Sequence, residues 1–134
     1  MIEKTLSIIK PDAVERDLGD SIKKIFQTKG LNILKSKKVQ ITKLEASEFY
    51  KVHETKPFYD ELCTYLSSGP IIVMILEGEN AILKNREIMG ATNPKDAAEG
   101  TIRKLYGISI DKNSVHGSDS LDNAKKEINF FFKN

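Results

Sequence analysis

The sequence predicts an α+β sandwich, in which helices pack on a small antiparallel sheet. Three strand-like segments are separated by helical segments, and a short fourth strand comes late in the chain. Strands and helices do not alternate strictly, as they would in a doubly wound sheet. The strongest strand signal, the run 71–76, lacks polar alternation, so both of its faces should be covered. These observations predict a four-stranded antiparallel sheet of the ferredoxin-like kind; the alternative, a flavodoxin-like sheet, needs more strong strands than the sequence offers.

The chain opens with a strand and a helix. Residues 5–9, Thr-Leu-Ser-Ile-Ile, are expected to form a buried strand that ends before Pro11, because proline cannot donate to a strand ladder. From Asp12 the apolar side chains recur at helical spacing. Gly30 is expected to end this helix, since glycine accepts the left-handed conformation that is common after a helix.

The second strand leads into two helices. Residues 31–34 and 39–41 alternate in polarity and are expected to form one long strand, interrupted by the lysines between them. Thr42 is expected to cap a helix that reaches Val52. Another helix follows Pro57, and Gly69 with the proline after it breaks this helix.

The third strand is the apolar run 71–76, after which residues 77–78 are expected to form a turn. A helix over residues 80–89 follows, with Gly90 at its end. Residues 91–100 are irregular, and their Asn-Pro pair marks a turn.

Two helices complete the chain. A short helix runs through residues 102–105 and ends at Gly107. The last helix begins near Ser120 and presents apolar side chains along one side, at positions Leu121, Ala124, Ile128, Phe131 and Phe132.

Composition limits the class of protein. The 134 residues carry 21 basic and 19 acidic side chains, and a net charge of +2 is too small to predict a nucleic-acid-binding surface. Cys63 is the only cysteine, which excludes an internal disulfide and suits a reducing compartment. No apolar run is long enough for a signal peptide or a membrane span. We therefore expect one cytoplasmic domain over residues 1–134, which no repeat or linker divides.

The most informative segment is the polar stretch 113–120, which holds one of the two histidines. Its small polar residues are not those that a packed core selects. The imidazole of His116 is largely neutral at physiological pH, so it can attack phosphorus without prior activation. Gly117 lets a substrate approach the backbone beside this ring. Ser118 and the two residues after it are candidate N-caps, and a helix N-terminus favours phosphate.

Standard phosphate-binding and metal-binding motifs are missing. The eight glycines form no G-x-G pair and none precedes Lys-Ser or Lys-Thr, so there is no dinucleotide fingerprint and no P-loop. The two histidines and one cysteine are too scattered for a zinc site. A cage for a polyphosphate would instead need cations, a hydroxyl and an amide from strand and helix ends: Lys10, Arg86, Arg103, Thr92 and Asn113. The alternative is that these lysines and arginines are simply solvated.

Glu127 borders the apolar side of the last helix. A carboxylate in that position needs a partner to offset its loss of hydration. An imidazole that becomes cationic, or the hydroxyl of Ser118, would be such a partner. The alternative is an exposed glutamate that pairs with Lys126 or Lys133.

Three largely apolar side chains lie on two neighbouring helices: Tyr50, Phe58 and Leu62. Residues at this spacing are more often core than a platform for a ligand. His53 follows Tyr50 by one helical turn and is assigned to the solvated surface, while Cys63 is assigned a structural role.

Seven short blocks of the sequence resemble, in order, those of nucleoside diphosphate kinases. The blocks are 10–14, 56–58, 68–71, 76–81, 89–94, 100–103 and 113–120, the last of which contains His-Gly-Ser-Asp-Ser. A lone histidine would say little, but these blocks in the family's order across residues 5–132 are specific. The resemblance is to the bacterial type, since the chain stops at Asn134 without the longer C-terminal tail of the animal enzymes.

The resemblance implies an activity and a role for each matched residue. A nucleoside triphosphate, typically ATP, would give its γ-phosphoryl group to a nucleoside diphosphate by a ping-pong route through a phosphohistidine, which maintains the pools of nucleoside and deoxynucleoside triphosphates. His116 matches the nucleophile, and Glu127 and Ser118 match the pair that orients its ring. The phosphates would meet Lys10, Tyr50, Arg86, Thr92 and Arg103; the ribose hydroxyl would meet Lys10 and Asn113; the base would meet Phe58 and Leu62.

The resemblance also implies a cofactor and an assembly. Mg²⁺ would be held mainly by the phosphates of the nucleotide, with no direct protein ligand. The chain would form a tetramer or a hexamer built from dimers, with no membrane and no specific nucleic acid as partner. Residues 17–20 and Ala13 depart from the family's pattern, which affects the entry of the first helix but not the catalytic set.

Two rival interpretations are open on the sequence. A ferredoxin-like module could bind RNA or a small effector without chemistry, although the aromatic strand motif of RNA-binding domains is missing. A pseudo-enzyme that serves as a scaffold is disfavoured, because every matched active-site position is intact.

Overall fold

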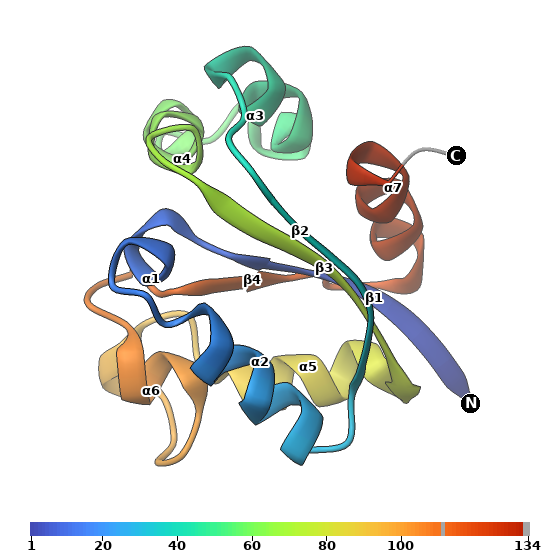
Figure 1. Ribbon diagram of the computed structural model, residues 1–134. Coiled ribbons are helices and arrows are strands. Elements are labelled where there is room, and N and C mark those ends of the chain that lie inside the picture. The colour runs from blue at the N-terminus through green and yellow to red at the C-terminus, as the bar shows by residue number, and fades with distance from the viewer. Residues whose placement is uncertain (111, 133–134) are drawn as a thin grey trace.

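A computed structural model describes residues 1–110 and 112–132 of the chain. Within these residues the chain forms a four-stranded antiparallel sheet in the order β2-β3-β1-β4, with β1 (Ile2–Ile9), β2 (Asn32–Val39), β3 (Ile71–Glu79) and β4 (Val115–Gly117). Helices lie on both faces of this sheet (Figure 1). The predicted α+β sandwich of the ferredoxin-like kind is therefore confirmed.

Each face of the sheet carries its own helices (Figure 1). One face is covered by α2 (Gly19–Thr28), α5 (Ala81–Met89) and α6 (Ile102–Tyr106), and the other by α3 (Lys43–Phe49), α4 (Tyr59–Leu66) and α7 (Leu121–Phe131). Shorter helices are α1 (Pro11–Glu15) and the 3₁₀ helices η1 (Lys51–His53) and η2 (Pro94–Asp96). In the part of the chain described here, none of the helices has both the length and the apolar character that crossing a membrane requires.

Coverage of both faces explains why the central strands carry apolar residues on both of their sides. Successive side chains of a strand point to opposite faces, so a strand buried on both sides favours apolar residues at neighbouring positions. In β1, Ile8 packs in the core beside α3, α4 and α7, whereas Ile9 packs in the core beside α2 and α5. In β3, Val73 and Met74 divide between the two cores in the same way. The predicted burial of both faces of the third strand is confirmed.

Three expected boundaries are wrong. The helix expected to reach Val52 ends at Phe49, and a separate 3₁₀ helix follows it. The helix expected from Asp12 is divided into α1 and α2, because the backbone at Asp17 adopts a left-handed conformation with φ 60°. The turn expected at residues 77–78 is replaced by strand, since β3 continues through them. Gly78 permits a close approach instead: a Cβ there would lie 2.8 Å from Cδ2 of Leu31.

Other elements begin close to their expected residues. β2 is one strand, as predicted, with an irregularity between Ile33 and Lys35. Thr42 caps α3 through a reciprocal pair of hydrogen bonds with Glu45. Ser120 caps α7 with its hydroxyl, so the start of the last helix is also as predicted.

The segment 113–120 is more buried than expected. It contributes β4 to the edge of the sheet, and Asn113, Ser114 and Ser118 are buried. Each of these polar side chains has a hydrogen-bond partner inside the protein, which makes its burial tolerable. The expectation that a packed core would not select this stretch is therefore wrong. Leu121, expected on the apolar side of α7, is 44% exposed.

Candidate active site

His116 lies on β4 and meets Glu127 of α7. Its Nε2 is 3.0 Å from Oε1 of Glu127, and the two side chains are 21% and 18% exposed. A carboxylate accepts hydrogen bonds, so the neutral imidazole carries its proton on Nε2. The lone pair is then on Nδ1, which is the nitrogen able to act as a nucleophile.

Ser118 completes this group. Its hydroxyl donates to Oε1 of Glu127 at 2.8 Å and accepts from the backbone N–H of Leu6 at 3.3 Å. Because Ser118 is fully buried, these contacts anchor the carboxylate against β1. Glu127 is thus held between a histidine and a serine, and its interpretation as an exposed glutamate is wrong. Lys133, one suggested partner of that exposed glutamate, lies outside the described residues.

Aromatic rings pack against the imidazole. Phe49 and Tyr50 lie edge-on to the ring of His116, with centroid distances of 5.4 and 6.4 Å. Burial, and then the negative charge of Glu127, raises the pKa of the Tyr50 phenol, which keeps this side chain neutral at physiological pH. The sequence does not single out Phe49, because an aromatic residue on a helix is usually core.

His53 is closer to His116 than expected. Its ring lies 6.2 Å from that of Tyr50 and 6.1 Å from that of Phe58, and it lines the same cavity of about 220 Å³ as His116. Burial, followed by the charges of Lys56 and His116, lowers the pKa of His53. The assignment of this half-buried side chain to the solvated surface is wrong. Its position one turn after Tyr50 is the signal that could have placed it.

A second group joins Lys10, Asn113 and Thr92. Nζ of Lys10 donates to Oδ1 of Asn113 at 2.9 Å, and Nδ2 of Asn113 donates to the carbonyl of Thr92 at 3.0 Å. Lys10 and Asn113 are buried although both are polar. The end of β1, the segment after α5 and the segment before β4 therefore meet at this point.

Arg86 and Arg103 face a cavity of about 650 Å³, which Thr92 also lines. Arg103 is 9% exposed and donates to two backbone carbonyls. Burial, and then the charge of Arg86, lowers the pKa of Arg103 to about 10, so its guanidinium is still cationic at physiological pH. Guanidinium groups match the geometry of phosphate oxygens, so this cavity suits a ligand of high negative charge.

Gly117 connects the two spaces. It lines the cavity of about 220 Å³ beside His116 and also the cavity of about 650 Å³ beside the arginines. A Cβ at this position would lie 2.2 Å from Nδ2 of Asn85 and 2.8 Å from Cε of Met89, so only glycine fits. The candidate nucleophile and the candidate phosphate-binding cations therefore face adjoining spaces.

The predicted base-contacting pair lies at the margin of this site. Phe58 directly precedes α4 and is 43% exposed, and Leu62 is half-buried in α4. The ring contact between Phe58 and His53 connects this pair to the aromatic residues around His116. An exposed aromatic ring at a cavity margin is available to a ligand, unlike the core residue that spacing alone favours.

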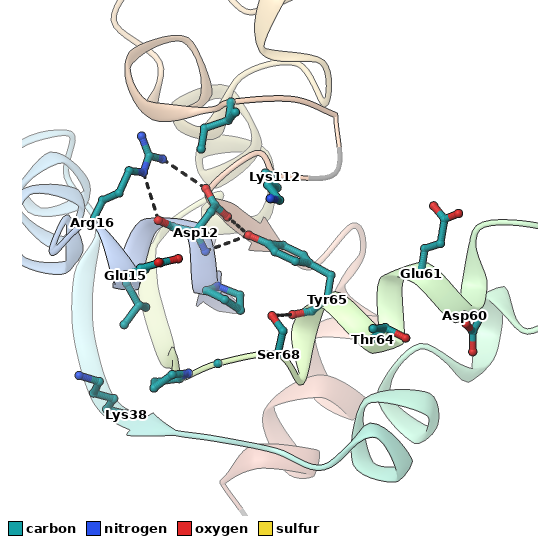
Figure 2. Close-up of a pocket in the computed structure, with 15 residues that line it drawn as sticks. Asp12, Glu15, Arg16, Lys38, Asp60, Glu61, Thr64, Tyr65, Ser68 and Lys112 are labelled. Atoms are coloured by element: carbon teal, nitrogen blue, oxygen red, sulfur yellow. Dashed lines mark hydrogen bonds and ion pairs between the residues drawn. The ribbon is translucent and has the colours of Figure 1, made fainter.

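A larger cavity has a different lining. It measures about 1060 Å³ and lies among α1, α4 and the segment before β4 (Figure 2). Its lining includes Asp12, Arg16, Tyr65 and Lys112. The sequence gives no signal for this cavity, because its walls come from distant parts of the chain.

Comparison with known proteins agrees with this geometry. A family model described as "Nucleoside diphosphate kinase" matches residues 3–134. A nucleoside diphosphate kinase of Gluconobacter oxydans (strain 621H) is 56% identical over 131 residues, which cover 98% of this chain and 94% of that protein. A nucleoside diphosphate kinase of Campylobacter lari (strain RM2100 / D67 / ATCC BAA-1060) is 58% identical over 131 residues, which cover 98% of this chain and 96% of that protein.

Solved structures give the same result. An orthorhombic crystal form of the Aquifex aeolicus nucleoside diphosphate kinase has a TM-score of 0.98 at 41% identity, and the match covers 100% of this chain and 97% of that chain. A crystal structure of nucleoside diphosphate kinase from Encephalitozoon cuniculi has a TM-score of 0.94 at 38% identity, and covers 98% of this chain and 90% of that chain. By sequence and by fold, the chain belongs to the nucleoside diphosphate kinase family, and its activity is that of a nucleoside diphosphate kinase, a nucleotide-binding phosphotransferase.

Proposed function

We propose that His116 carries the phosphoryl group between the two nucleotides. Nδ1 attacks the γ-phosphorus of a nucleoside triphosphate, typically ATP, the bond from this phosphorus to the bridging oxygen breaks, and the nucleoside diphosphate leaves. A second nucleoside diphosphate then attacks the phosphohistidine and takes the phosphoryl group in a similar in-line step. The observation that carries this proposal is the contact between Nε2 and Glu127, because it leaves the lone pair on Nδ1.

The other residues serve position and charge, which phosphoryl transfer needs more than it needs covalent machinery. Glu127 and Ser118 orient the imidazole, and Tyr50 packs beside it. We assign the binding of the nucleotide to the groups of residues described above. Its phosphates would bind Lys10, Arg86, Thr92 and Arg103, its ribose hydroxyl would bind Lys10 and Asn113, and its base would contact Phe58 and Leu62.

We propose that Mg²⁺ arrives with the nucleotide, held mainly by its phosphate oxygens. Within the described residues, no group of three or more His, Cys, Asp or Glu side chains is arranged to hold a metal ion. The cavity beside Gly117 offers the guanidinium groups of Arg86 and Arg103, which bind phosphate and not metal. Phosphate oxygens are the hard ligands that Mg²⁺ prefers, and the bound ion would neutralise part of their charge.

We also propose that residues 1–134 act as one domain in the cytoplasm, where the activity maintains nucleotide pools, and that they assemble as a tetramer or hexamer. Exposed apolar side chains in and after α6 support association, since Leu105, Ile108 and Ile110 are 54%, 59% and 55% exposed. Sedimentation velocity measures the subunit number directly. A monomer at working concentration would contradict the assembly.

Incubation with γ-labelled ATP and Mg²⁺ tests the phosphohistidine. The protein should acquire a label that is acid-labile and base-stable, and a nucleoside diphosphate should remove it. His116→Ala should not be labelled, whereas His53→Ala, which removes the other histidine, should keep the label. A labelled His116→Ala protein would remove His116 from the mechanism, and a binding module without chemistry would leave every variant unlabelled.

A further inference from the structure

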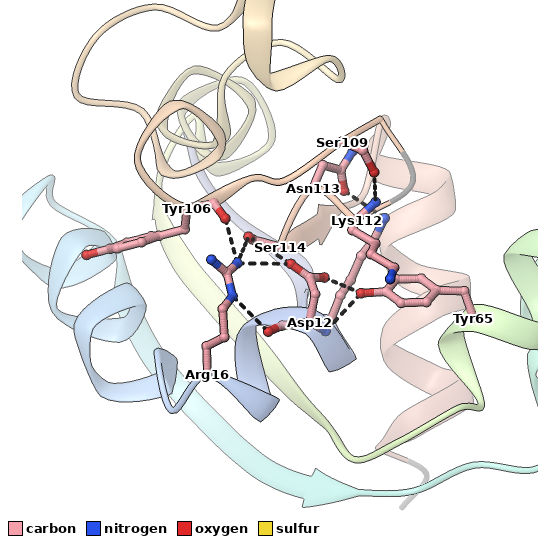
Figure 3. A network of polar contacts seen from close by, with 9 residues as sticks. Asp12, Arg16, Tyr65, Tyr106, Ser109, Lys112, Asn113 and Ser114 are labelled. Carbon is pink, nitrogen blue, oxygen red and sulfur yellow. Dashed lines mark hydrogen bonds and ion pairs between the residues drawn. The ribbon is translucent and has the colours of Figure 1, made fainter.

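A network of polar side chains centred on Asp12 lies along one wall of the cavity of about 1060 Å³ (Figures 2 and 3). The Asp12 side chain is 3% exposed. Its carboxylate accepts from the hydroxyl of Tyr65, from the hydroxyl of Ser114 at 3.1 Å and from Nη2 of Arg16 at 3.3 Å. A buried carboxylate with partners on separate parts of the chain connects those parts to one another.

Arg16 and Tyr65 brace this carboxylate from two sides. Nε of Arg16 donates to the backbone carbonyl of Asp12 at 3.1 Å, and its Nη2 donates to the carbonyl of Tyr106. The backbone N–H of Asp12 donates to the Tyr65 hydroxyl at 2.8 Å. Burial, and then the hydrogen bond and charge of Asp12, raises the pKa of the Tyr65 phenol, so this hydroxyl stays a donor.

Ser114 is the strained member of the network. Its φ is 75°, a left-handed conformation that is unfavourable for a residue with a Cβ. Such strain persists where surrounding contacts hold the backbone in place. Here the hydroxyl of Ser114 is bonded to Asp12, and its carbonyl accepts from the backbone N–H of Lys10 at 2.8 Å.

We propose that Asp12 is a positioning residue for the ribose of the nucleotide. The proposal rests on the proposed function, in which Lys10 and Asn113 meet the ribose hydroxyl. Asp12 follows Lys10 by two positions, and it holds Ser114, the residue next to Asn113. The network therefore fixes the backbone next to Lys10 and the backbone next to Asn113. Nζ of Lys10 and Oδ1 of Asn113 lie 2.9 Å apart.

Discrimination between nucleotides with and without ribose hydroxyls tests this role. A site built to hydrogen-bond a hydroxyl rejects the analogue that lacks it, because its own polar groups are left unpaired. We would measure kcat/KM for ADP and for 2′,3′-dideoxy-ADP, with GTP as the phosphoryl donor. The ratio of the two values does not depend on the fraction of active protein, so a loss of stability alone leaves it unchanged.

Asp12→Asn replaces one carboxylate oxygen with an NH₂ group, which cannot accept from a hydroxyl. The preference for ADP should fall by about tenfold. Tyr65→Phe removes one donor and should lower the preference by a smaller factor, so it tests the network even where Asp12→Asn fails to fold. Asp60→Asn is the matched control: it makes the same change in the same cavity, on a side chain that is 78% exposed, and it should keep the wild-type ratio.

Asn113→Ala separates this proposal from the proposed function. The variant should itself lower the ratio, and Asp12→Asn should have a smaller effect in its presence than in the wild type. An unchanged ratio in Asn113→Ala removes the ribose assignment, and the positioning role with it. A lowered ratio in Asn113→Ala, with unchanged ratios in Asp12→Asn and Tyr65→Phe, keeps the ribose assignment and overturns the role of Asp12.

Discussion

The Glu127 carboxylate lies 3.0 Å from Nε2 of His116 and so determines which imidazole nitrogen carries the lone pair. The two residues come from different elements: β4, which is the edge strand of the sheet, and α7, which packs on β1. In the mechanism that we propose, positive charge develops on the ring when Nδ1 bonds to phosphorus, and a carboxylate already in place stabilises that charge. We therefore assign Glu127 both an orienting and an electrostatic effect.

Glu127→Gln should lower the rate of His116 phosphorylation by about 10- to 100-fold, because the amide can accept a hydrogen bond but carries no charge. The dissociation constant for nucleotide should stay nearly unchanged. Single-turnover kinetics measure the rate, and a titration measures the affinity. Asp122→Asn, at an exposed acid of the same helix, is the control and should behave as wild type. A large rise in the dissociation constant of Glu127→Gln would count against an orienting role.

Gly117→Ala should slow transfer by roughly 10²-fold, because small displacements of a reacting group are costly in rate. The new Cβ would lie 2.2 Å from Nδ2 of Asn85, and because this side chain is fully buried and has little room to move, we expect β4 to shift and carry His116 with it. Adding Asn85→Ala removes the colliding amide and should restore part of the single-turnover rate. Gly69→Ala should keep the wild-type rate, since its nearest contact is an ordinary 3.7 Å. If Asn85→Ala gave no rescue, the collision would not be the cause.

Arg103→Gln should weaken ADP binding by about 10- to 100-fold, the effect of losing a charge-assisted contact to phosphate. The measurement is the rise in Tm that ADP produces, taken relative to each protein's own Tm without nucleotide, so that intrinsic stability does not enter. Lys104→Gln, at the exposed neighbouring cation of α6, should show the wild-type rise. Equal rises in Arg103→Gln and wild type would contradict the assignment of Arg103 to the phosphates.

His53 should make the protein less stable in mild acid. Burial, and then the charges of Lys56 and His116, lowers the pKa of this imidazole in the folded state. The unfolded chain therefore binds the proton more readily, and the stability present above about pH 6.5 is lost as the pH falls through the lower, folded-state pKa. The drop in Tm between pH 7.5 and pH 5 should be smaller in His53→Gln than in wild type. Equal drops would mean that His53 titrates normally in the folded protein.

The strands could be predicted because their signal is local. A segment buried on both faces tends to be a continuous apolar run, and the run 71–76 shows this directly. The break between α1 and α2 could not be predicted, because the helical spacing of apolar residues continues across Asp17. The turn expected at Gly78 was wrong for a related reason. This glycine is needed for its close approach to Leu31, a residue far away in the sequence, and the residues next to Gly78 do not indicate that contact.

Some residues of the candidate site could likewise be predicted from the sequence, and others could not. His116 stands out in its own short motif, and the place of Glu127 beside an apolar stripe indicated a need for a partner. Nothing in the sequence connects Asp12 with Ser114, because the burial of both depends on how β1 and β4 pair. His53 and Phe49 were missed because helical spacing does not distinguish a ring in the core from a ring beside an imidazole.

By itself, the sequence determined the class of fold and the ends of most helices and indicated His116 as the candidate nucleophile, since each of these depends on residues that are near one another in the chain. The tertiary structure alone decided which nitrogen of His116 is held, which cations share a cavity, and that a buried carboxylate joins the two sides of the Lys10–Asn113 pair. The physical reason is that hydrogen bonds and charge interactions act over a few ångströms in space, and the order of strands in the sheet sets which distant residues come within that range.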